Sequence, residues 1–256
     1  MIRGVWTHTA IGLTLAISLL PVLVALVIDQ GADVVPRLAL GALVITAWQV
    51  LFRIGLGVPF APAAAVTAIA VGVLAPQDAP LWQILLAVSF GTVIGELIFG
   101  GWGRNFLSAA TVSLAFLGLS VPAAHYTPPG DIVAYAVLPG AVILIATGIL
   151  SLPVLIASVA GFALVANGLG LDALPAAPLA FALIYLIADP VASAATPLGR
   201  WIYGALAGAL AALLIAGPAH AAQAAVFATL LAQIFAPLID QGALALHRQR
   251  RKARHG

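Results

Sequence analysis

Residues Ala188–Arg200, which read A-D-P-V-A-S-A-A-T-P-L-G-R, interrupt two long apolar runs of the chain. They bring together a carboxylate, two prolines, hydroxyls, a glycine and an arginine, a combination that the flanking runs lack. Proline ends a helix and leaves backbone carbonyls without partners, and a carboxylate at the edge of an apolar segment must pair or bind something. This polar break is therefore either a plain loop or the wall of a site.

The composition around this break is that of an integral membrane protein. The chain has 256 residues, is 63% hydrophobic and has a mean hydropathy of +1.17. Only 7% of its residues are charged, against about 25% in an ordinary soluble domain, so it cannot cover a water-soluble surface. Five of its ten Lys and Arg residues lie within His247–His255, which is typical of a cytoplasmic membrane flank rather than a nucleic-acid-binding arm.

The residue types exclude several cofactors. The chain has no cysteine, so by itself it cannot form a disulfide or ligate an iron–sulfur cluster through thiolates. Its five histidines are scattered without helical pairing, which argues against a haem or metal site; they are His8, His125, His220, His247 and His255.

The hydropathy pattern predicts an all-α fold of about ten transmembrane segments, because a backbone in lipid must satisfy its own hydrogen bonds. The third, fifth and eighth segments are short, and the third and eighth are predicted to be short or broken helices. The predicted segments are Thr9–Ile28, Arg37–Ile54, Pro59–Leu74, Leu81–Gly100, Leu107–Val121, Ile132–Ser151, Leu152–Leu169, Pro175–Ala188, Trp201–Gly217 and Ala221–Asp240.

The distribution of charge predicts the orientation. With both termini in the cytoplasm, nine of the ten basic residues are cytoplasmic, as the positive-inside rule favours. Arg37 is the exception. The cytoplasmic set is Arg3, Arg53, Arg104, Arg200 and the five basic residues of the tail, and the acids Asp29, Asp33, Asp78, Asp131 and Asp172 fall outside.

The two halves of the chain also correspond to each other. Each has a short, proline-bordered third segment and a polar break that contains S-A-A-T, from Phe99 to Thr111 and from Ala188 to Arg200. Five segments per half would place the halves in opposite orientations, as in an inverted repeat. We therefore predict repeats at residues 1–130 and 131–242, followed by a basic cytoplasmic tail at 243–256. Chance similarity of alanine-rich sequence is the alternative.

Polar residues at the two breaks are the candidate site residues. Glycines let a backbone approach a flat ring, and Arg and Asn supply donors, so Gly100, Gly101, Gly103, Arg104 and Asn105 form one cluster. Acids in or beside apolar spans are candidates for a cation or proton path, and these are Glu96, Asp189 and Asp240. Each also has a structural interpretation. Glu96 is hydrated at the cytoplasmic edge or pairs with Arg104, and Asp240 at the end of the last span has the same ambiguity. Asp189 pairs with Arg200 or caps the backbone turn, and the hydroxyls of Ser193 and Thr196 bond nearby backbone.

These motifs resemble a known membrane family. Three segments are similar to signatures of the family that contains RnfD of the Rnf complex and NqrB of the sodium-pumping NADH:quinone oxidoreductase. The first is Asp189-Pro190-Val191 with Thr196 and with Gly199-Arg200, which W-I-Y-G-A-L-A-G follows. The other two are G-G-W-G-R-N at Gly100–Asn105 and P-L-I-D ending at Asp240. Trp6-Thr7-His8 also lies where RnfD has a T-H pair. The matches come in the family's order along nearly the whole chain.

The resemblance implies an inverted-repeat fold of the urea-transporter type in the bacterial inner membrane. It also implies a subunit of a flavin-dependent electron-transfer complex, with other membrane and peripheral subunits, the lipid bilayer and quinone as partners and with no nucleic acid. Noncovalent riboflavin or FMN would be held by the cluster around Arg104 and by Asp189, Thr196, Gly199 and Arg200, while Asp189 and Asp240 would belong to a cation path.

The chain departs from this family in the region that would carry covalent FMN. The family has a hydroxyl-bearing S-(G/Q)-A-T motif, preceded by aspartate, between the fifth and sixth spans, whereas this chain has only Pro122–Asp131 there. After G-R-N it also reads L-S-A-A in place of the family's N-P-A. The sequence thus resembles a shortened homologue and gives covalent FMN little support. A channel or transporter for a small polar solute, or a scaffold that has lost its cofactor sites, remain alternatives.

Overall fold

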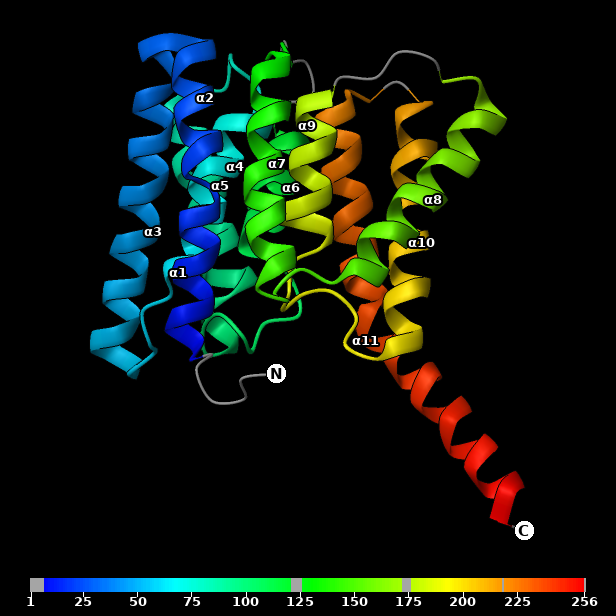
Figure 1. The fold of residues 1–256 in the computed structure, drawn as a ribbon. Helices are drawn as coiled ribbons and strands as arrows, with labels where there is room; N and C mark the ends of the chain where they lie inside the picture. Colours follow the sequence, from blue (N-terminus) through cyan, green and yellow to red (C-terminus); the bar gives the residue numbers. More distant parts are fainter. Residues whose placement is uncertain (1–6, 121–125, 172–175, 218, 256) are drawn as a thin grey trace.

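A computed structural model describes residues 7–120, 126–171, 176–217 and 219–255, with side chains up to residue 249 (Figure 1). All regular secondary structure within these ranges is helical, so the prediction of an all-α protein is confirmed. Arg3, Trp6, His125 and Asp172, which entered the predictions above, lie outside the described residues, as does part of Pro122–Asp131.

Among the described residues, the first half of the chain contains six helices and three short 3₁₀ segments, and the second half contains five helices and one π-helical segment. The helices of the first half are α1 (His8–Ser18), α2 (Leu20–Gln30), α3 (Val35–Leu56), α4 (Ala65–Leu74), α5 (Leu81–Gly95) and α6 (Ala109–Ser120), with 3₁₀ turns η1 (Gly31–Val34), η2 (Pro62–Ala64) and η3 (Leu97–Phe99). The second half contains α7 (Asp131–Ala146), α8 (Leu152–Leu169), α9 (Ala176–Phe181), the π-helical η4 (Ala182–Ile187), α10 (Pro197–Ile215) and α11 (Ala221–His255).

In the part of the chain that the structure describes, five helical stretches are long and apolar enough to cross a membrane, and four shorter apolar helices accompany them. The long stretches are His8–Leu56, Leu81–Phe99, Leu152–Leu169, Pro197–Ile215 and Ala221–Gln249, and the short ones are Pro62–Leu74, Ala109–Ser120, Asp131–Ala146 and Ala176–Ile187. The chain is therefore a multi-pass membrane protein. The count of ten crossings and the inverted repeat stay predictions.

Two predicted helix ends were wrong. The first predicted segment is divided at Leu19 into α1 and α2, because Pro21 at the start of α2 has no N–H for the preceding turn. Beside this break, the Ser18 carbonyl accepts a hydrogen bond of 2.8 Å from the buried Tyr185 hydroxyl. The last predicted segment ends at Asp240, whereas α11 continues as helix to His255, since Gly242 alone does not stop a helix.

Small residues bring pairs of helices into backbone contact. A Cβ atom added to Gly208 of α10 would lie 1.9 Å from the Ser158 carbonyl oxygen of α8, and one added to Gly204 would lie 2.5 Å from the Val154 carbonyl oxygen. In the first half, a Cβ on Gly91 of α5 would lie 2.0 Å from the Ser113 hydroxyl of α6. In lipid, the hydrophobic effect does not drive helices together, and close van der Waals packing at small residues stabilises their contact instead.

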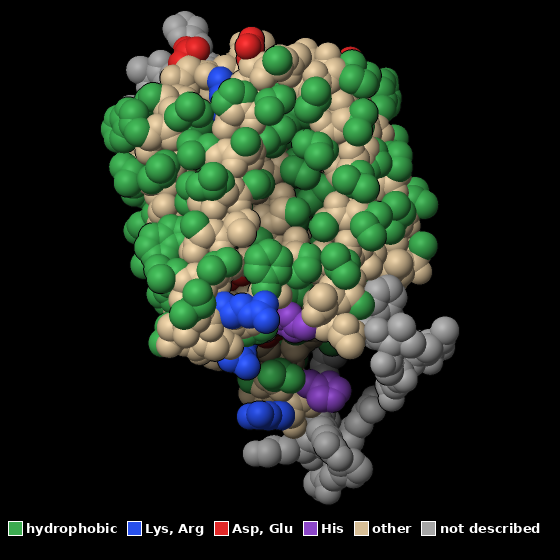
Figure 2. All heavy atoms as spheres, turned by 90° about the vertical axis from the view of Figure 1, so that its left-hand side faces the viewer, with side chains coloured by type: hydrophobic (Ala, Val, Ile, Leu, Met, Phe, Trp, Pro, Cys, Tyr) green, Lys and Arg blue, Asp and Glu red, His purple; other side chains and the backbone are tan. Residues whose placement is uncertain are grey.

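Charge is divided between the two ends of the molecule. Figure 2 shows acidic side chains at one end, Lys, Arg and His side chains at the other, and a hydrophobic band between them. A basic group also lies at the acidic end, where Arg37 donates a hydrogen bond to the Gln77 carbonyl and interacts with Asp78 and Asp33. The first described residues and the end of α11 both lie at the basic end (Figure 1). Which end faces the cytoplasm stays a prediction.

Candidate functional site at the meeting of the two breaks

The two polar breaks meet inside the helix bundle. The first break (residues 100–108) connects η3 to α6, and the second break (residues 188–196) connects η4 to α10. Between them lies a cavity of about 20 Å³ lined by Glu96, Asn105 and Ser108 from one side and by Tyr185 and Asp189 from the other. This volume holds about one water molecule.

The first break is a tight turn built on glycines. Gly100, Gly101 and Gly103 have φ values of 98°, 94° and 94°, which side chains other than hydrogen strongly disfavour. A Cβ on Gly103 would lie 2.1 Å from His8 Nε2, and one on Gly101 would lie 2.8 Å from Val58 Cγ1. The backbone of the break thus packs closely against side chains of the protein itself.

Asn105 completes this turn. Its Oδ1 accepts a hydrogen bond of 3.0 Å from the Gly103 N–H, and its Nδ2 donates one of 2.5 Å to the Leu107 carbonyl. Both ends of the buried amide therefore fix the backbone of the break, although Asn105 also borders the cavity.

Glu96 is a buried carboxylate with an unused oxygen. It ends α5, and its side chain is 4% exposed. The Trp102 N–H donates to the carboxylate, while Oε1 has no partner among the described residues. The predicted pairing of Glu96 with Arg104 is absent from the ion pairs and hydrogen bonds of the described residues, because Arg104 lies beside Gly100 on the outer surface of the turn.

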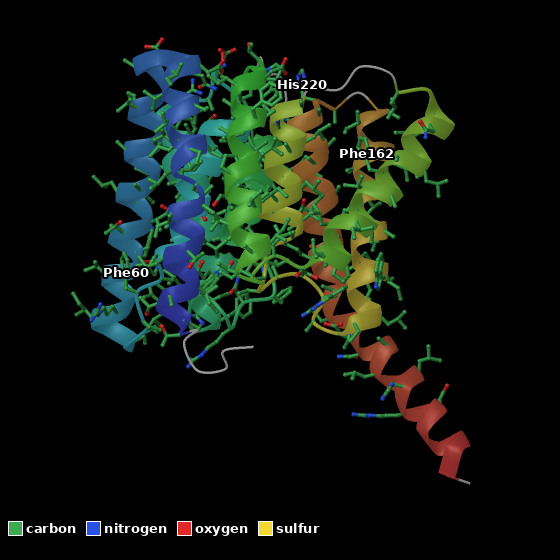
Figure 3. All side chains as sticks on the ribbon, in the orientation of Figure 1. Phe60, Phe162 and His220 are labelled. Carbon is green, nitrogen blue, oxygen red and sulfur yellow. The ribbon has the colours of Figure 1, made fainter. Side chains whose placement is uncertain are left out.

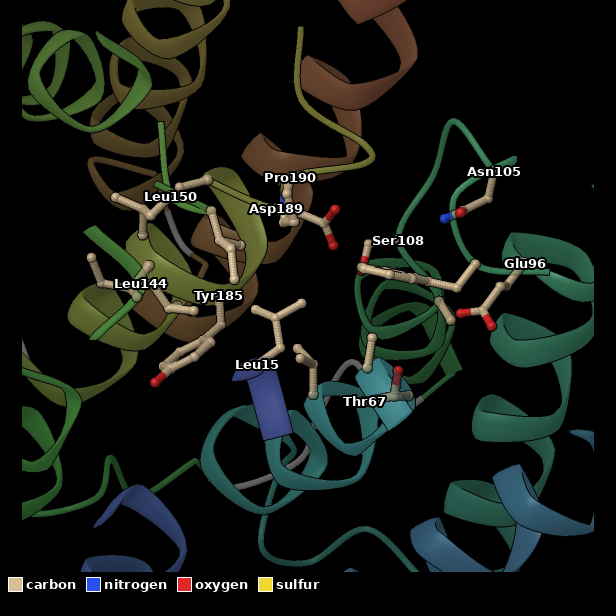
Figure 4. Close-up of a pocket in the computed structure, with 17 residues that line it drawn as sticks. Leu15, Thr67, Glu96, Asn105, Ser108, Leu144, Leu150, Tyr185, Asp189 and Pro190 are labelled. Carbon is tan, nitrogen blue, oxygen red and sulfur yellow. The ribbon is translucent and has the colours of Figure 1, made fainter. Parts of the chain in front are cut away.

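Asp189 lies opposite Glu96 across the cavity. Its Oδ1 accepts hydrogen bonds from the N–H groups of Val191 and Ala192, at 2.7 and 2.9 Å, and the Ser108 hydroxyl donates to the carboxylate. Figure 4 shows Asp189 and Ser108 facing each other, with Glu96 beyond Ser108. Burial raises the pKa of the Asp189 carboxyl, and these donors act in the opposite direction.

Gln233 of α11 joins the two breaks and was not predicted from the sequence. Its Oε1 accepts a hydrogen bond of 3.0 Å from the Ser108 N–H, and its Nε2 donates one of 3.2 Å to the Leu186 carbonyl at the end of η4. The side chain is fully buried. An amide in an apolar helix was the available signal, since such groups seek partners across helices.

Asp240 belongs to a different cluster, at the start of α10. Its Oδ2 accepts a hydrogen bond of 2.8 Å from the Ala195 N–H, and its Oδ1 accepts bonds of 2.9 and 2.6 Å from the N–H and hydroxyl of Thr196. The Thr196 hydroxyl in turn accepts a bond from the Gly199 N–H and caps α10, and Arg200 interacts electrostatically with Asp240. Asp240 thus ties α11 to the end of the second break.

The predicted residues therefore divide into three places. Glu96, Asn105 and Asp189 line the cavity. Gly100 and Arg104 line a groove of about 570 Å³ on the outside of the first break, beside Phe52, Val58 and Leu97. Thr196 borders another groove of about 550 Å³ against Leu244 and His247 of α11, near Gly199, Arg200 and Asp240. The structure brings the acids of the two breaks together and leaves the two groups of flavin candidates apart.

Comparison with known proteins decides the family. A model of the family described as NQR2, RnfD, RnfE matches residues 2–136 and 128–245. The chain belongs to this family. The family membership predicted from the motifs at the two breaks is therefore confirmed.

Relatives in the family are bacterial membrane-complex subunits. The NqrB subunit of the Na⁺-translocating NADH-quinone reductase of Pseudomonas paraeruginosa (strain DSM 24068 / PA7) is 29% identical over 250 residues, covering 75% of this chain and 62% of that protein. The same subunit of Yersinia pestis is 30% identical over 270 residues (81% and 65%), and that of Chromohalobacter salexigens is 28% identical over 265 residues (81% and 64%). The chain thus spans less than two thirds of the length of these relatives.

Proposed function

We propose that this chain is a membrane subunit of a multi-subunit, flavin-dependent electron-transfer complex of the Nqr/Rnf type. The observation that carries the proposal is that the family's motifs lie at the two breaks, which converge on the buried acids Glu96 and Asp189. Buried acids that line one cavity inside a membrane protein are costly to bury, and such acids typically mark ion or proton pathways. The proposed subunit would relay electrons or anchor flavin-carrying partners. Either role could be coupled to cation movement.

The inverted repeat of ten crossings is part of the same proposal. Helix α5 packs against α3 and α6, and α10 packs against α8 and α11, which are the equivalent positions in the second half. Helix α7 packs against α2, and α11 packs against α6, as expected for elements beside a pseudo-twofold axis. The first described residues and the described end of α11 lie at the basic end, which supports cytoplasmic termini in a bacterial inner membrane.

Noncovalent flavin does not fit between the two breaks as they lie, because the cavity holds about one water and ligand pockets measure about 300–1,000 Å³. The groove beside Gly100 and Arg104 is large enough, at about 570 Å³. Phe52 and Leu97 would provide flat apolar contact there, and the Arg104 guanidinium would donate to ring carbonyls. We place the expected riboflavin or FMN in this groove and assign no flavin to the cavity.

The native complex tests this function. Affinity purification of the full chain from its own membranes should recover redox subunits and extractable flavin. Asp189→Asn should lower electron transfer to quinone at least tenfold while the complex stays assembled, and Asp131→Asn, at the far end of the molecule, should leave the rate unchanged. Recovery of the chain without redox partners would overturn the proposal.

A scaffold that binds no cofactor is the second candidate. Gly101, Gly103 and Asn105 favour this candidate, because their close contacts and hydrogen bonds are made with other residues of the protein. Turnover that survives combined replacement of Arg104, Asp189 and Arg200 would support the scaffold. A solute transporter receives no comparable support, since the cavity between the breaks has room for about one water.

A further inference from the structure

A second cavity, separate from the two breaks, lies among the helices of the second half. It measures about 150 Å³ and is enclosed by α8, the α9–η4 segment, α10 and α11. Its floor is made of small buried residues, namely Ala182, Gly208, Ala211 and Ala225. The side chains of Ala182, Ala211 and Ala225 are short, so space remains between the surrounding helices, whereas the position of a Gly208 side chain is taken by the Ser158 backbone.

The walls of this cavity offer no group to a polar ligand. Ser158 is the one polar side chain among the described residues that line it, and its hydroxyl already donates a hydrogen bond of 2.8 Å to the Val154 carbonyl. Water needs two to four polar partners to occupy a buried site, and apolar cavities of about this volume remain dry and take up apolar molecules. Water, ions and lipid headgroups are therefore excluded as occupants.

The cavity opens toward the lipid-facing side of the bundle. Val159, on its wall, is 51% exposed, and Phe162 and Leu179 beside it are half-buried; Phe162 projects from α8 (Figure 3). Helix α8 is the least buried of the candidate spans, and its extensive packing is against α10. The mouth thus lies within an apolar helix surface that faces the surroundings.

The lining of the cavity is longest along the wall formed by α9 and η4. Lining residues extend there from Leu179 to Ile187, whereas α8 contributes Ser158 to Phe162 and α10 contributes Gly208 and Ala211. The longest wall of the cavity therefore runs parallel to a helix, which is also the direction in which lipid chains lie in a bilayer.

We propose that this cavity is a binding site for one hydrocarbon chain of a membrane phospholipid, held by apolar contact alone. Lipid chains are the apolar molecules that surround the mouth in a bilayer, and the slot admits a chain while its headgroup stays at the membrane surface. The site does not select the headgroup, because no free polar group faces the slot. This inference is independent of the proposed redox function.

Photolabelling in nanodiscs tests the site. The full chain is embedded in a phospholipid whose acyl chain carries a diazirine, irradiated and mapped by mass spectrometry. Half-buried Leu183, on the cavity wall, should be labelled at least as strongly as Leu43 of α3, which is 66% exposed. Labelling should be equal for phosphatidylethanolamine and phosphatidylglycerol carriers.

Matched substitutions separate the cavity from the general lipid surface. Ala211→Leu fills the floor and should lower labelling of Leu183 at least threefold, whereas Ala163→Leu, which adds the same volume to an exposed position on α8, should leave it unchanged. If Ala211→Leu does not fold, Ala180→Leu at the cavity wall serves instead. Labelling that is insensitive to the filling variant would overturn the proposal.

Two further outcomes would assign the cavity to another occupant. Loss of the label in the native complex, while it persists in the isolated chain, would show that a partner's side chain fills the slot. Loss of the label on adding an isoprenoid quinone at one twentieth of the lipid concentration would show that the slot prefers an isoprenoid tail. Either result would reject the phospholipid chain as the occupant.

Discussion

At the scale of single residues, Gln233 is the most informative position, because one side chain holds both breaks. Gln233→Leu would leave the Ser108 N–H and the Leu186 carbonyl without partners in a dry interior. Stranding each group costs about 1–2 kcal/mol, so the thermal midpoint of the purified protein in detergent should fall by several degrees. The chain has no cysteine, so a single cysteine at Ala188 should also become reactive to a water-soluble maleimide.

Gln83 of α5 provides the control. Its Oε1 has no hydrogen-bond partner among the described residues, so Gln83→Leu removes the same kind of group without stranding a partner on that oxygen. It should change the thermal midpoint little. Equal loss of stability in Gln83→Leu and Gln233→Leu would contradict the role assigned to Gln233.

Asp240 gives a second prediction at this scale. Its carboxylate accepts three hydrogen bonds from Ala195 and Thr196, so Asp240→Asn should lower stability by about 1 kcal/mol, the usual effect of losing a helix-terminal cap. Thr196→Val should act through the same contacts, so the double variant should lose less than the sum of the single losses. Strictly additive losses in thermal or denaturant unfolding would separate the two residues and leave Asp240 free for the predicted cation path.

The site was predictable in part. Proline, glycine and acid in an apolar sequence located both breaks, and the order of the motifs predicted the family. The partners of each polar group were not predictable, because Ser108–Asp189 and Gln233–Leu186 contacts depend on how helices distant in sequence pack. The size of the cavity between the breaks could not be predicted from the sequence either. This cavity is too small to hold a flavin.

At the scale of helices, the contact between α8 and α10 depends on the absence of side chains. Gly208→Ala places a methyl group 1.9 Å from the Ser158 carbonyl oxygen, which requires the helices to separate. Overpacking of this kind costs about 1–3 kcal/mol, so the thermal midpoint should fall. Gly168→Ala should have no such effect, because a Cβ added to Gly168 of α8 would meet no atom of another element within 4 Å. Equal falls of the thermal midpoint for the two substitutions would contradict the close contact between α8 and α10.

Helix positions were largely predictable, and helix interruptions were predictable only in part. Long apolar runs located α3, α5, α8 and α10 because lipid leaves the backbone few alternatives. The break at Leu19 was missed, since Pro21 reads as an ordinary residue of an apolar span until the Tyr185 hydroxyl is known to serve the Ser18 carbonyl. A short or broken eighth segment was predicted, but its π-helical form in η4 was not, because it depends on the Tyr203 hydroxyl and Gln233, which satisfy the carbonyls of Ile187 and Leu186.

At the scale of the whole molecule, the division of charge predicts which residues face each side of the membrane. In the cysteine-free chain, cysteines replacing Ala146 or Ala245 should react with an impermeant maleimide only from the cytoplasm, and cysteines replacing Ala32 or Gly168 only from outside. The Ala146 and Gly168 positions test whether α8, with its 18 residues, crosses completely. Reaction of both from the same side would reject the ten-crossing inverted repeat.

The bond between Tyr185 and Ser18 also has a consequence for biogenesis. The two residues are 167 positions apart, and the ribosome delivers the Ser18 carbonyl to the membrane long before it makes Tyr185. Until Tyr185 is made, the Ser18 carbonyl lacks this hydrogen-bond donor. A nascent chain that stops before α9 therefore keeps an unpaired carbonyl in its N-terminal helices. The N-terminal crossing is thus completed among the last, and a truncated half-protein should be recognised by membrane quality-control proteases even though its first helices are already inserted.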